Sequence, residues 1–303
     1  MMHTGDSLAV LEAPRARETG RVEAAPVVNE RVTEISPRAL GGLFDWREIW
    51  QYRELLFILA ARDIRVRYKQ TVVGALWAVL QPLATMTIFL ILFALLGQTP
   101  TTGRLPYGLT LLAGLFGWHL FSHTLTHSSM SLVANQQLVT RVYFPRVVLP
   151  MAAVLSGLVD LAIILAVLAG AMVVWGVSPG GQVVLFPLFF ALLLLASLGA
   201  GLWLSAMNAL YRDIVYVVPF LIQTGFYLSP VVYETQKLIP ERWRLVYALN
   251  PLAGILDGFR WTLLDGPRPS MISLAASLLG TGVLVVSGAV YFRRMERFFA
   301  DRI

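Results

Sequence analysis

The stretch that decides the fold runs from Arg62 to Trp77 and reads RDIRVRYKQTVVGALW. Its first half carries four cations, and its second half opens an apolar run, residues 71–97, without a charged residue. That run is long enough to cross a hydrocarbon core of roughly 30 Å. Because basic flanks of membrane spans stay on the cytoplasmic side, the stretch marks a boundary between cytoplasm and bilayer.

The composition of the whole chain also indicates a membrane protein. Its 303 residues are 57% hydrophobic and 14% charged, with a mean hydropathy of +0.68, whereas soluble domains are about 25% charged. The net charge of +6 comes from cations at the ends of apolar runs, where they set orientation, so we expect no nucleic-acid partner. The chain has no cysteine, which excludes disulfides, thiolate chemistry and cysteine-ligated zinc.

Six membrane spans are expected after the boundary stretch. We place them at residues 72–97, 107–134, 148–175, 183–208, 214–230 and 271–292. Arginines of the connections 135–147 and 209–213 and of the tail fall on one side with Lys69, and the opposite short loops carry one cation. The positive-inside rule therefore predicts that both termini are cytoplasmic.

Two segments precede the first span. Residues 1–44 mix Glu, Arg, Pro and Ala with few aromatics, so we expect a disordered cytoplasmic arm. In residues 45–70, apolar side chains recur at three- and four-residue spacing: Trp46, Ile49, Trp50, Leu56, Phe57, Ala60 and Ile64. This pattern predicts an amphipathic helix lying along the membrane surface, followed by a six-helix transmembrane domain over residues 71–303.

The order of residues in the boundary stretch adds a family resemblance. The motif Arg-Asp-Ile-x-Val-Arg-Tyr-Lys-Gln-Thr, followed by Gly74, Trp77 and Pro82, resembles the permease subunits of type-2 ABC exporters of O-antigen, teichoic acid and capsule. The resemblance covers residues 46 to about 300 of the chain. It implies an all-α polytopic protein of the bacterial inner membrane, acting as a homodimer with two copies of an ABC ATPase. The implied substrate is a lipid-linked polysaccharide, with O-antigen favoured.

Such a transporter needs an energy source. A P-loop requires Gly-Lys followed by Ser or Thr, and the two lysines, Lys69 and Lys237, are followed by Gln70 and Leu238. We therefore expect no cofactor on this chain, with ATP and Mg²⁺ held by a separate ATPase. The chain is predicted to be a transporter subunit and not an enzyme.

The connection 135–147 is the expected contact for that ATPase. It combines arginines, aromatics and a proline, and such side chains anchor many protein interfaces. The resemblance implies a short coupling helix here, while the residues alone fit a headgroup-facing turn equally well. The candidate contact residues are Gln137, Arg141, Tyr143, Phe144, Pro145 and Arg146.

The basic end of the boundary stretch is expected to receive the lipid headgroup. Cations at a bilayer surface attract phosphate and bond its oxygens. The candidates for this cytoplasmic entrance are Arg62, Arg65, Arg67, Tyr68 and Lys69.

The second expected span is unusually polar. His119, His123 and His127 follow at intervals of four residues, each of which turns a helix by about 40°, so the imidazoles share a face. A metal would need further ligands, so we favour a polar face turned to the conduit or to the dimer interior, and no metal. Aromatic faces that stack on sugars add four conduit candidates: Trp118, Phe121, Phe226 and Tyr227.

Asp160 is the one acidic residue inside an expected span. An intramembrane carboxylate is a functional candidate by default. Its partner would be a cation such as Arg212 or a histidine of the second span. A protonated or hydrogen-bonded structural group fits equally.

The outer segment 231–270 separates the last two expected spans. Two prolines bracket a piece with apolar residues at helical spacing but without the length to span. This pattern predicts half-inserted helices, and the resemblance implies a re-entrant pair at the outer mouth; a plain extracellular loop is the alternative. The candidate gate residues are Pro230, Tyr233, Asn250, Pro251 and Arg260.

Two other functions fit some of these features. A type-2 permease for another lipid or a drug usually has a large outer domain or a different first helix, and this sequence shows neither. A membrane-embedded transferase needs carboxylates or a catalytic histidine beside a polar pocket. The outer acids form no recognisable constellation of that kind: Glu234, Glu241, Asp257 and Asp265.

Overall fold

The computed structural model describes residues 46–69, 72–97 and 105–302. All regular structure within these ranges is helical. The arm expected over residues 1–44 lies outside them. The helices are α1 (Trp46–Gln51), α2 (Arg53–Tyr68), α3 (Val72–Leu95), α4 (Tyr107–Ala134), α5 (Gln136–Arg141), α6 (Val148–Val174), the 3-10 helix η1 (Gly181–Leu185), α7 (Phe186–Leu210), α8 (Ile214–Leu228), α9 (Thr235–Leu238), α10 (Glu241–Tyr247), α11 (Pro251–Leu264) and α12 (Met271–Arg302).

Four of the described helical segments are long and apolar enough to cross a membrane. They are Leu76–Leu95, Val148–Val174, Gly181–Leu210 and Met271–Phe299. Of the other two expected spans, α4 has 28 residues but carries many polar side chains, and α8 is apolar but has only 15 residues. The chain is therefore an all-helical polytopic membrane protein.

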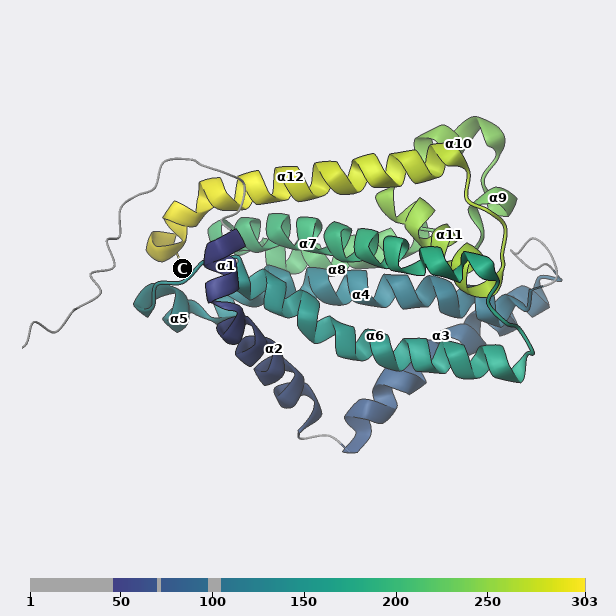
Figure 1. The fold of residues 1–303 in the computed structure, drawn as a ribbon, viewed down its shortest axis with the longest axis horizontal. Helices are drawn as coiled ribbons and strands as arrows, with labels where there is room; N and C mark the ends of the chain where they lie inside the picture. Colours follow the sequence, from purple (N-terminus) through teal and green to yellow (C-terminus); the bar gives the residue numbers. More distant parts are fainter. Residues whose placement is uncertain (1–45, 70–71, 98–104, 303) are drawn as a thin grey trace, which may run out of the picture. The chain divides into compact units, whose positions relative to one another are not determined.

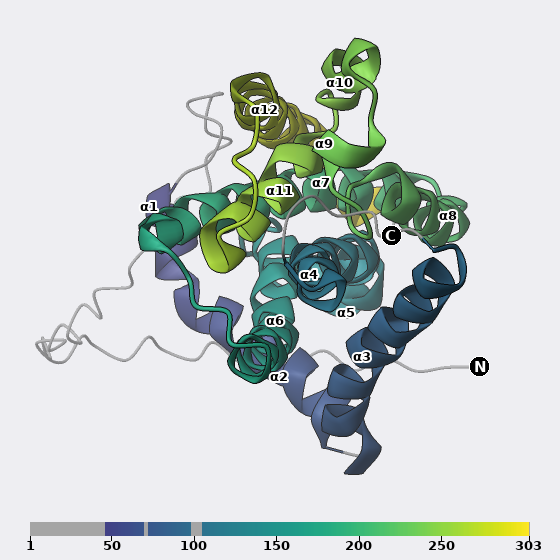
Figure 2. The same cartoon turned by 90° about the vertical axis from the view of Figure 1, so that its right-hand side faces the viewer.

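The polar helix α4 lies among the others. It contacts α3, α6, α7, α8 and α11, and Figure 2 shows it in their midst. Every residue from Tyr107 to Trp118 is buried, which is typical of a helix in the core of a bundle. The hydroxyl-bearing residues Thr124, Ser128 and Ser131 are buried as well. These polar side chains therefore contact protein and not lipid.

Helices α7 and α12 run side by side along much of their length (Figure 1). Small residues allow the close approach: a Cβ on Gly199 would lie 2.7 Å from the carbonyl carbon of Leu284. Farther along, Trp203 stacks on Tyr291 with ring centroids 4.3 Å apart. Glycine at a helix crossing of this kind lets backbones pack directly, which stabilises helix pairs in lipid.

The end of α6 shows how local sequence sets a helix boundary. Gly176 adopts a positive φ of 66°, and its N–H donates to the carbonyl of Val173 at 3.2 Å. The next N–H, that of Val177, donates to the carbonyl of Met172 at 2.9 Å. This pair of bonds closes a helix through one left-handed residue, a conformation that favours glycine.

The segment before the first span differs from the single helix expected over residues 45–70. The chain turns at Tyr52, so α1 and α2 are separate helices. Ile49 and Leu56 are buried in a core shared with α6 and α12, whereas Trp50 and Phe57 are 69% and 62% exposed. The apolar residues thus divide between a face on the protein and a face turned outward, a division that spacing alone does not reveal.

The two ends of the bundle hold different short segments. Helices α1 and α5 lie at one end with the last turns of α12, and α9, α10 and α11 lie toward the other (Figure 1). At one end α5 contacts the central helix α4, and at the other end α11 contacts it.

Candidate functional site

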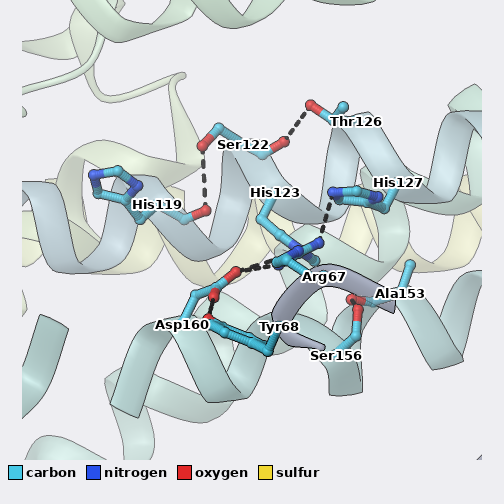
Figure 3. Close-up of polar contacts among 10 residues, drawn as sticks. All are labelled: Arg67, Tyr68, His119, Ser122, His123, Thr126, His127, Ala153, Ser156 and Asp160. Carbon is cyan, nitrogen blue, oxygen red and sulfur yellow. Dashed lines mark hydrogen bonds and ion pairs between the residues drawn. The ribbon is translucent and has the colours of Figure 1, made fainter. Parts of the chain in front are cut away.

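Five polar side chains meet where the last turn of α2 reaches α4 and α6. Arg67 and Tyr68 come from α2, His123 and His127 from α4, and Asp160 from α6 (Figure 3). They line a cavity of about 570 Å³ whose other walls come from α3, α4, α6 and α8. Those walls are formed by Trp77, Ala78, Gln81, His119, Ser122, Thr126, Ile164 and Ile222.

Arg67 holds this cluster together. Its Nη1 donates to Oδ2 of Asp160, and its Nη2 contacts Nε2 of His123 at 2.6 Å and Nε2 of His127 at 2.9 Å. The Tyr68 hydroxyl donates to the other carboxylate oxygen, Oδ1. Hydrogen bonds between ionised partners are roughly twice as strong as neutral ones. The end of α2 is thereby fixed to two helices at once.

Local sequence places the α4 and α6 members of this cluster. The four-residue spacing puts the histidines on one face of α4, and all three line the cavity. On α6, Gly157 lies one turn before Asp160 and makes room for an imidazole, since a Cβ there would lie 2.7 Å from Nδ1 of His123. The close crossing of α4 and α6 thus depends on a glycine beside the carboxylate.

The imidazoles of the cluster face an organic cation, the guanidinium of Arg67. Both α4 imidazoles direct Nε2 at the guanidinium of Arg67, so a cation already occupies the position between them. Within the described ranges, no group of three or more His, Cys, Asp or Glu is arranged to hold a metal ion.

Asp160 has both kinds of partner that were expected as alternatives, a histidine of the second span and a cation. Nε2 of His123 lies 3.7 Å from its Oδ2, in line with a histidine of the second span. The cation is Arg67 and not Arg212, which corrects the cation named from the sequence. The sequence assigned Arg67 to the membrane surface, and its side chain lies instead against α6, ninety-three positions further along the chain.

The other residues expected at the cytoplasmic entrance do not join the cluster. Arg62 bonds Asp63 and, at 2.8 Å, the Asn135 side chain. Arg65 is exposed and donates to the carbonyl of its own helix four residues back at 3.3 Å, and Lys69 is also exposed. The candidate set therefore divides into two residues that line the cavity and three that do not.

The connection 135–147 contains the short helix α5. Gln137, Arg141 and Tyr143 are exposed, whereas Phe144 is 4% exposed in the core shared with α2 and α12, and Pro145 is half-buried. This side of the molecule therefore offers an exposed helix held in place by a buried aromatic residue.

Several contacts tie this connection to neighbouring helices. Arg146 donates to the carbonyl of Glu296 in α12, and its guanidinium lies 5.9 Å from the centre of the Phe299 ring. On the other side, the Tyr143 hydroxyl donates to Glu48 of α1 at 3.4 Å. Burial, and then the nearby Glu48 carboxylate, raise the pKa of Tyr143. The connection is thus linked to the first and the last described helices, α1 and α12.

The four aromatic conduit candidates form one continuous group. The Trp118 ring lies 5.9 Å from Phe121 and 5.8 Å from Phe226, measured between centroids. Phe226 in turn packs edge-on against Tyr227 at 5.3 Å. Trp118 is buried and Tyr227 is 60% exposed, so the group runs from the interior of the bundle to its surface.

Arg260, a candidate residue of the outer gate, is buried and does not line an open entrance. It is 1% exposed, and it donates through Nε to the Thr110 carbonyl at 3.1 Å and through Nη1 to Asp257 at 2.9 Å. Its Nη2 donates to the carbonyls of Pro230 at 2.6 Å and Val231 at 2.8 Å. One guanidinium therefore fixes α11 and the turn after α8 to the start of α4.

The remaining residues expected at the outer gate make contacts in the same region. The Tyr233 hydroxyl donates to the Tyr227 carbonyl at 3.0 Å and lies 2.9 Å from the hydroxyl of Tyr247; burial raises the pKa of Tyr233. Asn250 caps α11 by accepting from the backbone N–H two residues on at 3.0 Å, and Pro251 is the first residue of that helix.

Asp257 is the residue of this region whose pairing with Arg260 the sequence analysis did not predict. It was counted among outer acids without a constellation, yet it pairs with Arg260 three positions later on the same helix. That i, i+3 spacing is a recognisable signal for a helical pair. Spacing alone does not show that the Arg260 side chain is 2% exposed and the Asp257 side chain 13% exposed.

Comparison with known proteins agrees with this architecture. The profile described as ABC-2 type transporter matches residues 54–264. The O-antigen export system permease protein RfbA of Myxococcus xanthus is 28% identical, covering 85% of this chain and 98% of that protein. The protein of the same name from Klebsiella pneumoniae is 29% identical, with 86% and 96% covered. The polysialic acid transport protein KpsM of Escherichia coli is 26% identical, with 80% and 93% covered. The chain belongs to the ABC-2 type transporter family.

Proposed function

We propose that this chain is the permease subunit of an ATP-driven exporter that moves a lipid-linked polysaccharide, of the O-antigen kind, across the bacterial inner membrane. The observation that carries the proposal is the nearly full-length match to relatives named for O-antigen export. A further relative named for polysialic acid transport supports polysaccharide as the substrate class. Neither a lipid or drug permease nor a transferase has a comparable observation in its favour.

In this proposal the chain crosses the membrane six times, with α4 and α8 as the second and fifth spans. A helix of 28 residues is about 42 Å long at 1.5 Å per residue, enough for a span. Its polar side chains face other helices and the cavity, where they avoid lipid. Both termini are then cytoplasmic, and α10 and α11 form the re-entrant pair at the outer side.

The proposed assembly is a homodimer with two copies of an ABC ATPase, which binds ATP and Mg²⁺. Support comes from α5, whose exposed Gln137 and Arg141 lie beside the exposed Tyr143. Aromatic and arginine side chains of this kind anchor protein interfaces. Because Tyr143 contacts α1 and Arg146 contacts α12, movement of α5 would be passed to both helices.

For the substrate, we propose that the phosphate-bearing headgroup approaches the exposed Arg65 and Lys69, which flank the cavity-lining Arg67 in the sequence. Cations at this position attract anionic headgroups. The glycan would then pass the aromatic group formed by Trp118, Phe121 and Phe226, whose flat faces suit the C–H faces of sugars. Tyr233 and Asn250 would shape the exit.

The proposal is tested by gentle purification of the chain from its native membrane. Equal amounts of an ABC ATPase in the preparation, and lipid-linked glycan retained on the inner leaflet when the chain is deleted, are the expected results. A variant with Arg141→Glu and Tyr143→Ala should lose the ATPase, whereas Thr140→Ala should keep it, because that hydroxyl bonds carbonyls of its own helix. A chain that purifies without ATPase, with export intact after deletion, would refute the proposal.

A further inference from the structure

We propose that His123 and His127 are proton-sensitive positioning residues. Their unprotonated Nε2 atoms hold Arg67 at the end of α2 against Asp160, and protonation of either imidazole loosens this end of α2 from α4 and α6. The unit formed by Arg67, Tyr68, His123, His127 and Asp160 is called the α2 clamp below.

The first step is the direction of the hydrogen bonds. A guanidinium has five N–H donors and no acceptor. Nη2 of Arg67 carries two hydrogens and has two imidazole partners, Nε2 of His123 at 2.6 Å and Nε2 of His127 at 2.9 Å. Both Nε2 atoms must therefore accept, so both imidazoles are neutral and carry their proton on Nδ1 in the clamped state.

The second step is competition for Asp160. Its Oδ2 accepts from Nη1 of Arg67, and Nε2 of His123 lies 3.7 Å away from that same oxygen. A protonated His123 would carry a hydrogen on Nε2, lose its bond from Arg67 and be attracted to the carboxylate. Protonation of His123 thus removes one hydrogen-bond acceptor of Arg67, and the protonated imidazole then competes with Arg67 for the Asp160 carboxylate.

The third step is the charge around the imidazoles. From α2 they face Arg67, Tyr68 and Asp63; from α4 itself, His119; and from α6, Asp160. The cavity residues of α3 and α8 carry no charge. Asp63 is already paired with Arg62 at 2.9 Å, and Asp160 is already paired with Arg67. A new positive charge on an imidazole of α4 would therefore lie beside Arg67 and repel it.

Protons can reach the two imidazoles, and the direction of the pH effect follows from their neutral state. His127 is exposed and both imidazoles line the cavity, so protons can reach them. Because the clamped state requires neutral imidazoles, it binds fewer protons than the released state, and its population falls as the pH falls. Histidine ordinarily changes charge between about pH 5 and 8. The positive charge of Arg67 beside both imidazoles disfavours their protonation, so the transition lies at the acidic end of that window or below it.

Release would free the C-terminal end of α2, while Leu56, Leu59 and Ala60 keep the earlier turns packed in the core shared with α6 and α12. Its other end follows α1, whose Glu48 bonds Tyr143 next to α5. The inference rests on the proposed function only in making this displacement of α2 a step of export, in which Arg67 becomes available beside the entering headgroup. The displacement itself is a property of the isolated chain.

The experiment uses the absence of cysteine from the chain. Ser122→Cys places one thiol in the cavity wall, and its labelling rate by a small polar methanethiosulfonate reagent is measured in lipid nanodiscs between about pH 8 and pH 4.5, from above the ordinary histidine range to below it. Thr140→Cys, on the exposed face of α5, is the matched control for the pH dependence of the thiol. The ratio of the two rates reports the opening of the cavity.

We expect this ratio to rise severalfold on acidification. In a background with His123→Gln and His127→Gln the ratio should stay low and flat, because an amide oxygen accepts at every pH in the range. With Arg67→Gln it should be high and flat, since the donor is gone. A flat ratio in the original background, or a rise in the glutamine background, would overturn the inference.

Two features keep the test decisive. His127→Gln alone, at an exposed position, replaces the double variant if that variant fails to fold, and it should reduce the rise. No ATPase or glycan is present in the nanodiscs, so a negative result would reject the clamp while leaving the exporter proposal to its own test.

Discussion

Arg67 and Arg260 attach short segments to opposite halves of α4, and each is paired with one aspartate. Arg260 is 1% exposed and bonds three backbone carbonyls in addition to Asp257. Arg67 has a side chain 28% exposed, lines a cavity and bonds two imidazoles in addition to Asp160. The same residue type therefore has permanent partners at one position and partners that can change charge at the other.

The difference indicates which end of the bundle can move. A carbonyl accepts hydrogen bonds at every pH, and a buried arginine without its partners would leave several polar groups unsatisfied. The outer attachment is therefore expected to stay closed. An imidazole accepts only when neutral, and a cavity can hydrate a released guanidinium, so the attachment of α2 is expected to open at far lower cost.

The largest expected effect is that of Arg260→Ala. Truncation leaves the Asp257 carboxylate buried without its ion pair, and breaking a buried pair costs about 3 to 5 kcal/mol. The free energy of unfolding in detergent should fall by that amount, with reduced yield from the membrane. Arg268→Ala is the control: this arginine is exposed and lies 5.7 Å from the Trp261 ring centre, a contact with an expected energy of about 0.5 to 1 kcal/mol.

Equal losses for Arg260→Ala and Arg268→Ala would show that the outer attachment is not a buried anchor. Arg260 would then no longer differ from Arg67 in being a fixed, buried attachment.

A smaller effect is expected for Asp160→Asn. The substitution removes the charge between Arg67 and Tyr68, and hydrogen bonds to charged groups contribute about 1.5 to 3 kcal/mol. Arg67 can be hydrated in the cavity, so the loss should be below that of Asp257→Asn, whose partner Arg260 is buried. Thermal unfolding of both variants in nanodiscs measures the order, and the reverse order would remove the distinction between a fixed and a releasable attachment.

The helices and side-chain pairs compared above could be predicted from the sequence to different extents. Apolar length and the charged flanks predicted α3 and α4 to within two residues of their ends, because desolvation of the backbone demands long uninterrupted helices. The shared face of the three histidines followed from helical periodicity. The i, i+3 pair formed by Asp257 and Arg260 was equally readable but lacked any sign of burial.

Other features depend on contacts between distant residues. The bond between Arg67 and Asp160 joins positions 93 apart, and no local pattern specifies which helices cross there. The turn at Tyr52 has neither proline nor glycine to announce it, and the burial of Phe144 depends on α2 and α12 packing over it. Tertiary packing, and not local preference, decides such features.

Gly114→Ala tests the outer attachment from the side of α4. A Cβ at this position would collide with the Val231 carbonyl and lie 2.6 Å from Nη2 of Arg260. Overpacking of this kind costs about 1 to 3 kcal/mol, measured as a lower free energy of unfolding. Gly170→Ala in α6 is the matched control, since nothing lies within 4 Å of its Cβ, and alanine should there stabilise the helix by about 0.5 to 1 kcal/mol.

The smallest effect is expected at Arg62 and Asp63, a third arginine and aspartate pair. Nη2 of Arg62 lies 2.9 Å from Oδ1 of Asp63, but the two side chains are 47% and 37% exposed. Exposed ion pairs contribute about 0 to 1 kcal/mol because water and salt screen them. Asp63→Asn should therefore change the free energy of unfolding by less than Asp160→Asn, and the change should shrink further in high salt. If it instead matched Asp160→Asn, pairing alone and not burial would explain the attachment of α2, and the contrast between Arg67 and Arg260 would have to rest on their titratable partners only.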